Sequence, residues 1–458
     1  MSTAQAVRPA GPSEETVREW LETELGPVTM LARQARWRPV WFADVERDGG
    51  VLRLCVRGPR VDNEPQFPLD HEMRFQRLLQ EAGLPVARVH GSSADPSFYV
   101  MDRVDGVPDF AASTDAERRS IVDQYLQVLA RIHRLDVRPF AAAGITRAPD
   151  PTLSWQPGIA AFERAYRVTK ARPDPLMEWG LGWLRRNPLA NPSGRESPVV
   201  WDSGQFLHAN GRLTALMDLE LGHVGDPMMD LAGWRMRDTI IPYGDFTELY
   251  ARYEEYRGEP VDLEAIRWHH FAFTLTNQLS FHAALAAPPP GSAYMTNLQW
   301  CAETNVMVVE AYAEDHGIEL EQLALPAYEG SPVAPAFAHL VASLRNFPAT
   351  DDITAYEARM AFRLARHLER FDQIGRIVTD ADLDDLARLL GRRPASWEEG
   401  ERALEEFVLA DDGARDTELL LLFNRRTQRA QMLLGPAGSA MARHHKVQPF
   451  PKEPAAFR

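Results

Sequence analysis

The sequence predicts an α+β protein in which a small antiparallel sheet is followed by a larger helical region. Strand-like segments separated by turn signals gather before residue 105, at residues 39–45, 51–57, 88–90 and 98–101. From Thr114, which opens a Thr-Asp-Ala-Glu capping box, apolar residues recur at helical spacing. Residues 352–434 show helical periodicity throughout. The chain therefore combines a mixed region with an all-helical extension.

The length of 458 residues exceeds what one hydrophobic core supports, so more than one compact unit is expected. We predict a disordered tail at 1–12, a sheet-bearing lobe at 13–105, a helical lobe at 106–347, a helical extension at 348–440 and an extended tail at 441–458. Helices of the extension are expected at 355–371, 380–390, 397–408 and 416–434. Such modules commonly serve either packing or dimerisation, and a homodimer through these helices is one of these two alternatives.

Composition and charge exclude several classes of partner. The net charge of −15 disfavours nucleic acid and anionic membranes, and it requires any nucleotide site to be a local basic patch. The two cysteines, Cys55 and Cys301, lie far apart, which indicates a reducing compartment and no zinc site. Residues 1–12 lack the apolar core of a signal peptide, and no apolar run is long enough to span a bilayer. We therefore expect a cytoplasmic protein.

The most informative stretch is residues 199–234, and the segment 198–234 within the helical lobe is expected to carry the catalytic residues. A short strand is expected at 198–201, and the arms of a hairpin at 206–208 and 212–217. The hairpin turn is Asn210-Gly211, because Asn-Gly between two apolar runs is the strongest short hairpin signal. This frame brings Asp202, Gln205 and Asp218 to one edge. Two carboxylates and an amide suit a hard cation with oxygen ligands, and Mg²⁺ with a nucleotide is the usual case.

The end of this stretch resembles a known family. Asp218-Leu219-Glu220 is followed by Gly225-Asp226-Pro227-Met228-Met229-Asp230-Leu231-Ala232. This pattern is similar to the catalytic segment of the aminoglycoside phosphotransferase family, kinase-like enzymes that phosphorylate hydroxyl groups of small molecules. The family's His-Gly lead-in is absent here, and Asp202 stands three residues before Gln205 rather than five. The resemblance implies a protein-kinase-like two-lobed fold, with the sheet in the N-lobe and helices in the C-lobe.

The resemblance also implies roles for the acidic residues of the stretch. Asp202 becomes the catalytic carboxylate on a shortened loop. Asp218 becomes a Mg²⁺ ligand, and Gln205 becomes the second metal contact, where the family has Asn. Asp226 and Asp230 are assigned to structural support, because each can receive backbone amides at a helix start.

In the N-lobe the resemblance implies a nucleotide site. Arg57 stands where the phosphate-contacting cation of the third strand belongs, and Glu72 stands where its helix partner belongs. Residues 98–105 resemble the hinge that receives the adenine edge through backbone hydrogen bonds, with Tyr99 and Met101 as cofactor-binding residues. The alternative is that Arg57 is a surface cation and Glu72 a solvated helix residue.

Two further features of the sequence concern the loop at residues 31–39 and His133. Residues 31–39 lack the glycines that usually let backbone amides approach phosphate oxygens. Arg33, Arg36 and Arg38 could supply side-chain cations instead, or form a basic turn that contacts nothing. His133 is expected to be a structural histidine near the catalytic loop.

The implied activity is transfer of a phosphoryl group from ATP, with Mg²⁺, to a hydroxyl of a small molecule. Aromatic and amide side chains of a helix expected at 262–285 could wall the acceptor pocket, or could belong to a buried helix pair. The rival function is a pseudoenzyme that acts through its helical extension, because the Gly loop, the His-Gly lead-in and the Asn are all altered. A serine hydrolase built on Ser203 is disfavoured, since the flanking glycine pattern of a nucleophile elbow is missing.

Overall fold

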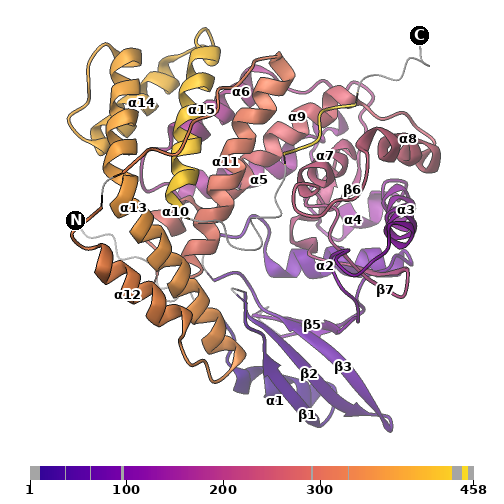
Figure 1. Ribbon diagram of the computed structural model, residues 1–458. Coiled ribbons are helices and arrows are strands. Elements are labelled where there is room, and N and C mark those ends of the chain that lie inside the picture. Colours follow the sequence, from indigo (N-terminus) through magenta and orange to yellow (C-terminus); the bar gives the residue numbers. More distant parts are fainter. Residues whose placement is uncertain are drawn as a thin grey trace. The chain divides into compact units, whose positions relative to one another are not determined.

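The computed structural model describes residues 11–36, 38–61, 63–93, 97–289, 292–328, 330–435 and 446–451 (Figure 1). The predicted terminal tails lie partly outside this range, at residues 1–10, 441–445 and 452–458. The chain forms two compact units. Unit 1 comprises residues 1–161, 190–269 and 445–458, and unit 2 comprises residues 162–189 and 270–444.

The N-terminal part of unit 1 is a five-stranded antiparallel sheet in the order β1-β2-β3-β5-β4 (Figure 1). Its strands are β1 (Val28–Arg33), β2 (Val40–Arg47), β3 (Gly50–Arg57), β4 (Val89–Ser92) and β5 (Tyr99–Asp102). The predicted β2–β3 hairpin is confirmed, and Asp48 and Gly49 at its turn have φ angles of 53° and 76°. Strand β1 was not predicted, because apolar and polar residues do not alternate clearly in its sequence.

One helix packs against each face of this sheet. Helix α1 (Glu14–Glu24), capped by the Ser13 hydroxyl, packs Val17 and Leu21 against the face that carries Leu54 and Val56. Helix α2 (Leu69–Glu81) packs against the opposite face, which carries Tyr99 and Met101. Because side chains alternate along a strand, Arg57 points to the α2 face, and its cross-strand neighbour is Tyr99. The register of β3 therefore directs Arg57 toward α2.

The rest of unit 1 contains the motif stretch and the helices around it. These elements are α3 (Asp115–Ile132), α4 (Arg138–Ala142), β6 (Ser197–Val199), β7 (Phe206–Ala209), β8 (Arg212–Leu216), a 3-10 turn (Leu219–Leu221), β9 (His223–Gly225), α7 (Met228–Arg237) and α8 (Phe246–Arg257). The Thr114 capping box is present at the start of α3. The predicted hairpin is β7–β8, and Asn210 and Gly211 both have positive φ, as a type I′ turn requires. Strand β6 pairs with β9.

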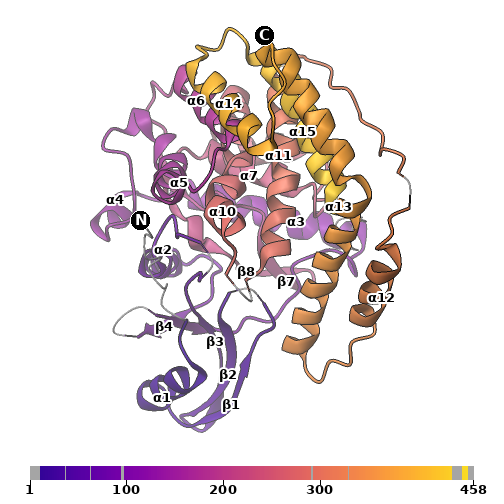
Figure 2. The ribbon, with the colours of Figure 1, turned by 90° about the vertical axis from the view of Figure 1, so that its left-hand side faces the viewer.

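Unit 2 is helical. It holds α6 (Pro175–Arg186), α10 (Thr276–Ala286), α11 (Tyr294–His316), α12 (Ala334–Arg345), α13 (Asp352–Leu390), α14 (Trp397–Ala410) and α15 (Asp416–Leu433). The remaining helices are α5 (Gln156–Thr169) and α9 (Leu263–Thr274), each of which has its first residues assigned to unit 1 and its last residues to unit 2. Helices α11, α13 and α15 pack together (Figure 2). None of the helices in the described residues has both the length and the apolar character needed to cross a membrane.

Two predicted helix boundaries in this region are wrong. The segments 355–371 and 380–390 belong to one helix, α13, because Ile374 and Val378 continue the buried face through the polar stretch between them. The helix expected at 262–285 is two helices, α9 and α10. The hydroxyls of Thr274 and Thr276 bind the carbonyls of Phe271 and Phe273, and such local hydrogen bonds compete with the helical ladder.

The polar residues of α10 are engaged inside unit 2. Gln278 Nε2 and His282 Nδ1 lie 2.7 and 3.0 Å from Oδ2 of Asp174, and His282 is fully buried. Asp174 also caps the start of α6 by accepting a hydrogen bond from the Met177 amide. These contacts favour the buried helix pair as the role of α10.

Candidate active site

The turn after β6 adopts a conformation that other parts of unit 1 hold in place. Trp201 has a φ of 58° and Gly204 a φ of 84°, so two residues of the turn lie in the left-handed region. The carboxylate of Asp230, in the first turn of α7, accepts hydrogen bonds from the amides of Val200 at 3.1 Å and Trp201 at 2.5 Å. A strained turn persists only where its surroundings determine it, and Asp230 provides that constraint.

Asp230 is itself held by His133. His133 Nε2 lies 3.0 Å from Asp230 Oδ2, and His133 Nδ1 lies 2.6 Å from the Tyr253 hydroxyl. All three side chains are buried. Asp226 accepts a hydrogen bond from the Met228 amide at the start of α7 and pairs with Arg195 at 3.2 Å. Asp230 and His133 thus support the turn, whereas Asp226 binds the backbone at the start of α7.

Asp202 projects from this turn and is bound on both of its oxygens. Gln205 Nε2 donates to Oδ2 at 2.9 Å, and Arg237 donates to Oδ1 from Nη2 and from Nε, the latter at 3.1 Å. One quarter of the Asp202 side chain (25%) is exposed, so the carboxylate remains accessible to a ligand. Gln205 and Arg237 together fix its orientation.

The hairpin β7–β8 brings Gln205 and Asp218 to the same edge. The Met217 amide donates to the Gln205 carbonyl at 2.9 Å, so the residues at the two ends of the hairpin face each other. Asp218 follows with left-handed backbone angles (φ 55°, ψ 56°), which a non-glycine residue rarely adopts. Its side chain is 32% exposed. Asp202, Gln205 and Asp218 therefore lie along one edge, the arrangement expected from the sequence.

Next to this edge lies a cluster of charged side chains, here called the arginine–carboxylate cluster: Arg38, Arg57, Arg60, Glu72, Asp218 and Glu220. Arg57 Nε lies 2.7 Å from Glu72 Oε1, and Arg57 Nη2 pairs with Asp218. The predicted pairing of the β3 cation with the α2 carboxylate is present in the structure. Glu72 is 3% exposed, so it is not a solvated helix residue.

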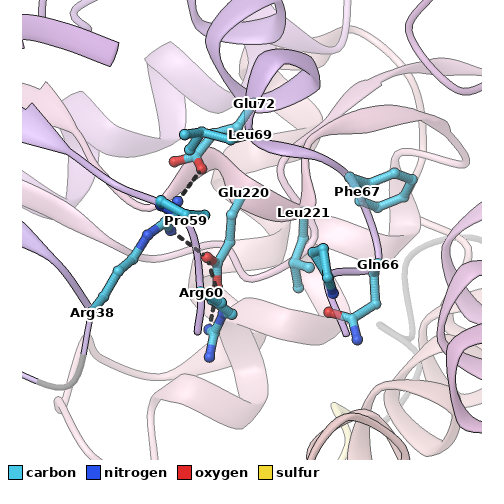
Figure 3. Close-up of a pocket in the computed structure, with 10 residues that line it drawn as sticks. Arg38, Pro59, Arg60, Gln66, Phe67, Leu69, Glu72, Glu220 and Leu221 are labelled. Carbon is cyan, nitrogen blue, oxygen red and sulfur yellow. Dashed lines mark hydrogen bonds and ion pairs between the residues drawn. The ribbon is translucent and has the colours of Figure 1, made fainter. Parts of the chain in front are cut away.

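Arg38 occupies the other side of Glu72 (Figure 3). Its Nη2 lies 2.8 Å from Glu72 Oε2, its Nη1 lies 2.6 Å from Glu220 Oε2, and its Nε donates to the Gly58 carbonyl at 2.7 Å. Arg60 pairs with the other oxygen of Glu220. Arg38, Arg60, Glu72 and Glu220 line a small pocket, with Phe67 and Leu221 among its apolar walls. Three guanidinium groups and three carboxylates thus balance one another in the cluster.

A family model described as the phosphotransferase enzyme family matches residues 36–269, just over half of the chain. The chain belongs to this family. The matched range contains the turn, the hairpin and every member of the arginine–carboxylate cluster. The prediction of a kinase-like α+β fold with a helical C-terminal part is confirmed.

Solved structures similar to this phosphotransferase family member include three small-molecule kinases. Macrolide 2′-phosphotransferase MphH from Brachybacterium faecium is 20% identical, with a TM-score of 0.44 over 64% of this chain and 98% of that chain. Choline kinase LicA from Streptococcus pneumoniae is 14% identical, with a TM-score of 0.47 over 66% and 98%. A thermostable mutant of aminoglycoside phosphotransferase APH(4)-Ia, bound to AMP-PNP and hygromycin B, is 16% identical, with a TM-score of 0.45 over 65% and 99%. No curated protein matched the chain.

Burial and nearby cations set the ionisation of the acidic groups. Burial alone would raise the pKa of Asp218, but Arg57, Arg38 and Arg60 outweigh it and hold that pKa well below the usual range. Burial raises the pKa of Asp202, and the charge of Asp218 adds to this rise, while Arg237 partly offsets it. The two aspartates therefore interact electrostatically yet have pKa values displaced in opposite directions. Such a separation is typical of acids with different roles.

The donor chemistry at this edge fits Mg²⁺. The carboxylate oxygens of Asp218 and the amide oxygen of Gln205 are hard ligands, and Mg²⁺ usually completes its shell with water and phosphate oxygens. Within the described ranges, no group of three or more His, Cys, Asp or Glu side chains is arranged for a metal ion.

Two predicted nucleotide-site residues occupy positions that differ from the expectation. Tyr99 and Met101 lie within β5, which pairs with β3 on one edge and β4 on the other, so ladder hydrogen bonds engage their backbone. This corrects the expectation of a free hinge backbone at these two residues. The Tyr99 hydroxyl is instead 3.2 Å from Glu72 Oε1, and burial raises the Tyr99 pKa well above its usual value.

The three arginines of the glycine-free loop at residues 31–39 differ in their contacts and in their exposure. Arg33 donates from Nη1 to carbonyls of its own loop, including that of Arg38 at 3.1 Å. Arg36 is exposed. Arg38 alone of the three enters the arginine–carboxylate cluster, where it is 4% exposed.

Sequence reasoning missed Glu220, Arg60 and Arg237 as site residues. Glu220 belongs to the Asp-Leu-Glu motif, and its position two residues after Asp218 was the available signal. Arg60 follows Arg57 by three residues through Gly58-Pro59, which returns the chain toward the cluster. Arg237 had no signal, because it reaches Asp202 only through the packing of α7.

Proposed function

We propose that this family member transfers the terminal phosphoryl group of ATP, bound with Mg²⁺, to a hydroxyl group of a small molecule. The observation that carries the proposal is the convergence of Asp202, Gln205 and Asp218 on one edge, with the Arg57–Glu72 pair in contact with Asp218. Phosphoryl transfer requires mainly positioning and charge neutralisation, and this arrangement supplies the groups for both.

Each residue then has a distinct task. Arg57, oriented by Glu72, binds the phosphate oxygens, because a guanidinium held by a carboxylate presents its remaining donors in a fixed direction. Asp218 and Gln205 hold Mg²⁺, which neutralises negative charge on the phosphates when it is bound. Asp202 accepts or orients the proton of the acceptor hydroxyl. Its raised pKa makes it a better proton acceptor than an ordinary aspartate while Arg237 keeps it ionised.

Arg237→Gln should move the acid limb of the pH–rate profile to higher pH. Removing the cation that lowers the Asp202 pKa leaves burial and the charge of Asp218 to raise it further, so the carboxylate is protonated at a higher pH. We expect kcat/KM at pH 7 to fall about tenfold through looser positioning of Asp202. The measurement is kcat/KM from pH 5 to 9.

Arg237→Lys is the matched control. It keeps the positive charge next to Asp202 and should therefore keep the acid limb of the pH–rate profile near its original pH. An Arg237→Gln profile that superimposes on that of the unmodified protein would show that Asp202 does not titrate in the reaction.

A direct test of nucleotide binding is thermal unfolding with and without Mg²⁺ and AMP-PNP. A ligand present at one hundred times its dissociation constant stabilises the folded state by about 2.7 kcal/mol. We expect a rise in melting temperature with Mg²⁺ and AMP-PNP together, and a much smaller rise with AMP-PNP in the presence of EDTA. Equal rises in melting temperature under both conditions would contradict the proposed role of Mg²⁺.

The second candidate is a binding protein without turnover. The observation that favours it is the charge balance of the arginine–carboxylate cluster, in which Arg57 and Arg60 pair with the acids that a metal would need. This candidate predicts nucleotide binding that is independent of Mg²⁺ and no consumption of ATP with any hydroxylated acceptor. The same thermal experiment, combined with an assay of ADP release, separates the two functions.

A further inference from the structure

The described C-terminal residues, 446–451, belong to unit 1 and lie against α7 and α8; they are called the strap here. Gln448 has contacts on both ends of its amide. Its Nε2 donates to Asp238 Oδ2 at 2.7 Å and to the Gly244 carbonyl at 2.8 Å, and its Oε1 accepts from the Phe246 amide at 3.4 Å. Gln448 thus ties the end of α7 to the start of α8.

A second anchor secures the strap. Arg235 of α7 is fully buried, its guanidinium lies 3.7 Å from the centre of the Phe450 ring, and its Nη2 donates to the Gln448 carbonyl. Arg267 lies 5.0 Å from the same ring. Pro451 is buried next to Phe450 in the sequence. A cation–π contact is stronger when its cation is removed from water, as Arg235 is, so Phe450 holds the strap in one position.

A series of hydrogen bonds connects Gln448 to the turn after β6, which carries Asp202. Asp238, 1% exposed, binds Gln448 with Oδ2 and accepts the Tyr243 amide with Oδ1 at 2.8 Å. The Tyr243 hydroxyl donates to the Gly204 carbonyl at 2.6 Å. Gly204 lies between Asp202 and Gln205 in the turn, and the Tyr125 hydroxyl accepts its amide proton at 2.7 Å. The turn is therefore held from the side of α7 by the same loop that the strap fixes.

We propose that the strap is a positioning element of the active site and that Gln448 acts as a positioning residue through Asp238 and Tyr243. When Gln448 is lost, the buried Asp238 carboxylate loses a hydrogen bond and reorients, which releases the Tyr243 amide and loosens the hold of Tyr243 on Gly204. Asp202 then samples orientations outside the productive one. The effect of this displacement on turnover rests on the proposed function.

The first test compares Gln448→Ala with the unmodified full-length protein by hydrogen–deuterium exchange. Amides of residues 200–206 should exchange at least about tenfold faster in the variant, because their protection depends on the closed turn. Lys446→Ala, at an exposed strap position, is the control and should leave this exchange unchanged. Unchanged exchange at 200–206 in Gln448→Ala would overturn the proposal. This readout does not depend on turnover, so it stays decisive if the protein proves not to be a kinase.

The second test is a rescue. Gln448→Glu places a carboxylate against Asp238 and should increase exchange at 200–206 and lower kcat by about tenfold or more, with a smaller change in KM. Adding Asp238→Asn restores one donor and one acceptor at this contact and should recover most of the protection and of kcat. A double variant as impaired as Gln448→Glu would show that the contact does not transmit the effect, and would overturn the assignment of Gln448. Absence of any ATP-dependent activity in the unmodified protein would reject the proposed function alone.

Discussion

Asp218→Ala is expected to lower kcat/KM for ATP-dependent phosphoryl transfer by at least about 10³-fold, since a metal ion contributes several kcal/mol to transition-state stabilisation. Asp218 is the proposed Mg²⁺ ligand, and its carboxylate is held ionised by Arg57, Arg38 and Arg60. Removing it also leaves Arg57 paired with Glu72 and, at 3.7 Å, with Glu220. The measurement is steady-state turnover at several Mg²⁺ concentrations, together with thermal stabilisation by Mg²⁺ and AMP-PNP.

Asp218→Asn separates charge from shape. The amide keeps the size of the side chain but binds Mg²⁺ weakly, so this variant should lose nearly as much activity as Asp218→Ala while folding normally. Turnover of Asp218→Asn within about tenfold of the unmodified protein would contradict the metal role of Asp218, because a lost hard ligand costs more than the 1.36 kcal/mol that tenfold represents.

Glu72→Ala should destabilise unit 1 by about 3–5 kcal/mol, the usual cost of removing one partner of a buried ion pair. Glu72 binds Arg57 with one oxygen and Arg38 with the other, and both arginines are largely buried. The truncation leaves an excess positive charge in the cluster and removes the acceptor of the Tyr99 hydroxyl. Urea unfolding, followed by tryptophan fluorescence and circular dichroism, measures the loss.

The matched variant is Glu72→Gln, which keeps an acceptor oxygen for one arginine and should destabilise the protein less than alanine does. Activity should fall in both variants, since Arg57 loses the group that orients it. A free energy of unfolding for Glu72→Ala that lies within about 1 kcal/mol of the unmodified protein would contradict this prediction. It would show that the pairs of Glu72 with Arg57 and Arg38 stabilise the protein less than buried ion pairs usually do.

The local parts of the fold could be predicted from the sequence because their causes are local. The Asn210-Gly211 turn and the Thr114 capping box each depend on a few adjacent residues, and both are present. The approach of Gln205 to Asp218 followed in the same way, because the two residues flank the ends of one hairpin.

The contacts that complete the site depend on residues far apart in the chain. Arg38 and Glu220 are separated by 182 residues, and Gln448 and Asp238 by 210. No periodicity or turn signal carries such information, since these pairs form only when elements pack in three dimensions. The joining of two predicted helices into α13 has a similar origin, because the polar stretch between them is kept helical by the packing of Ile374 and Val378 on its buried face.

The most direct measurement of the central claim follows the terminal phosphate of labelled ATP into a set of hydroxylated small molecules, with the unmodified protein and with Asp202→Asn. The account predicts Mg²⁺-dependent transfer of label to at least one acceptor, and a rate lower by about 10²–10⁴-fold for Asp202→Asn, the range that general base catalysis contributes. Label that passes to the acceptor equally fast with Asp202→Asn, or that never leaves ATP with any acceptor, would contradict it.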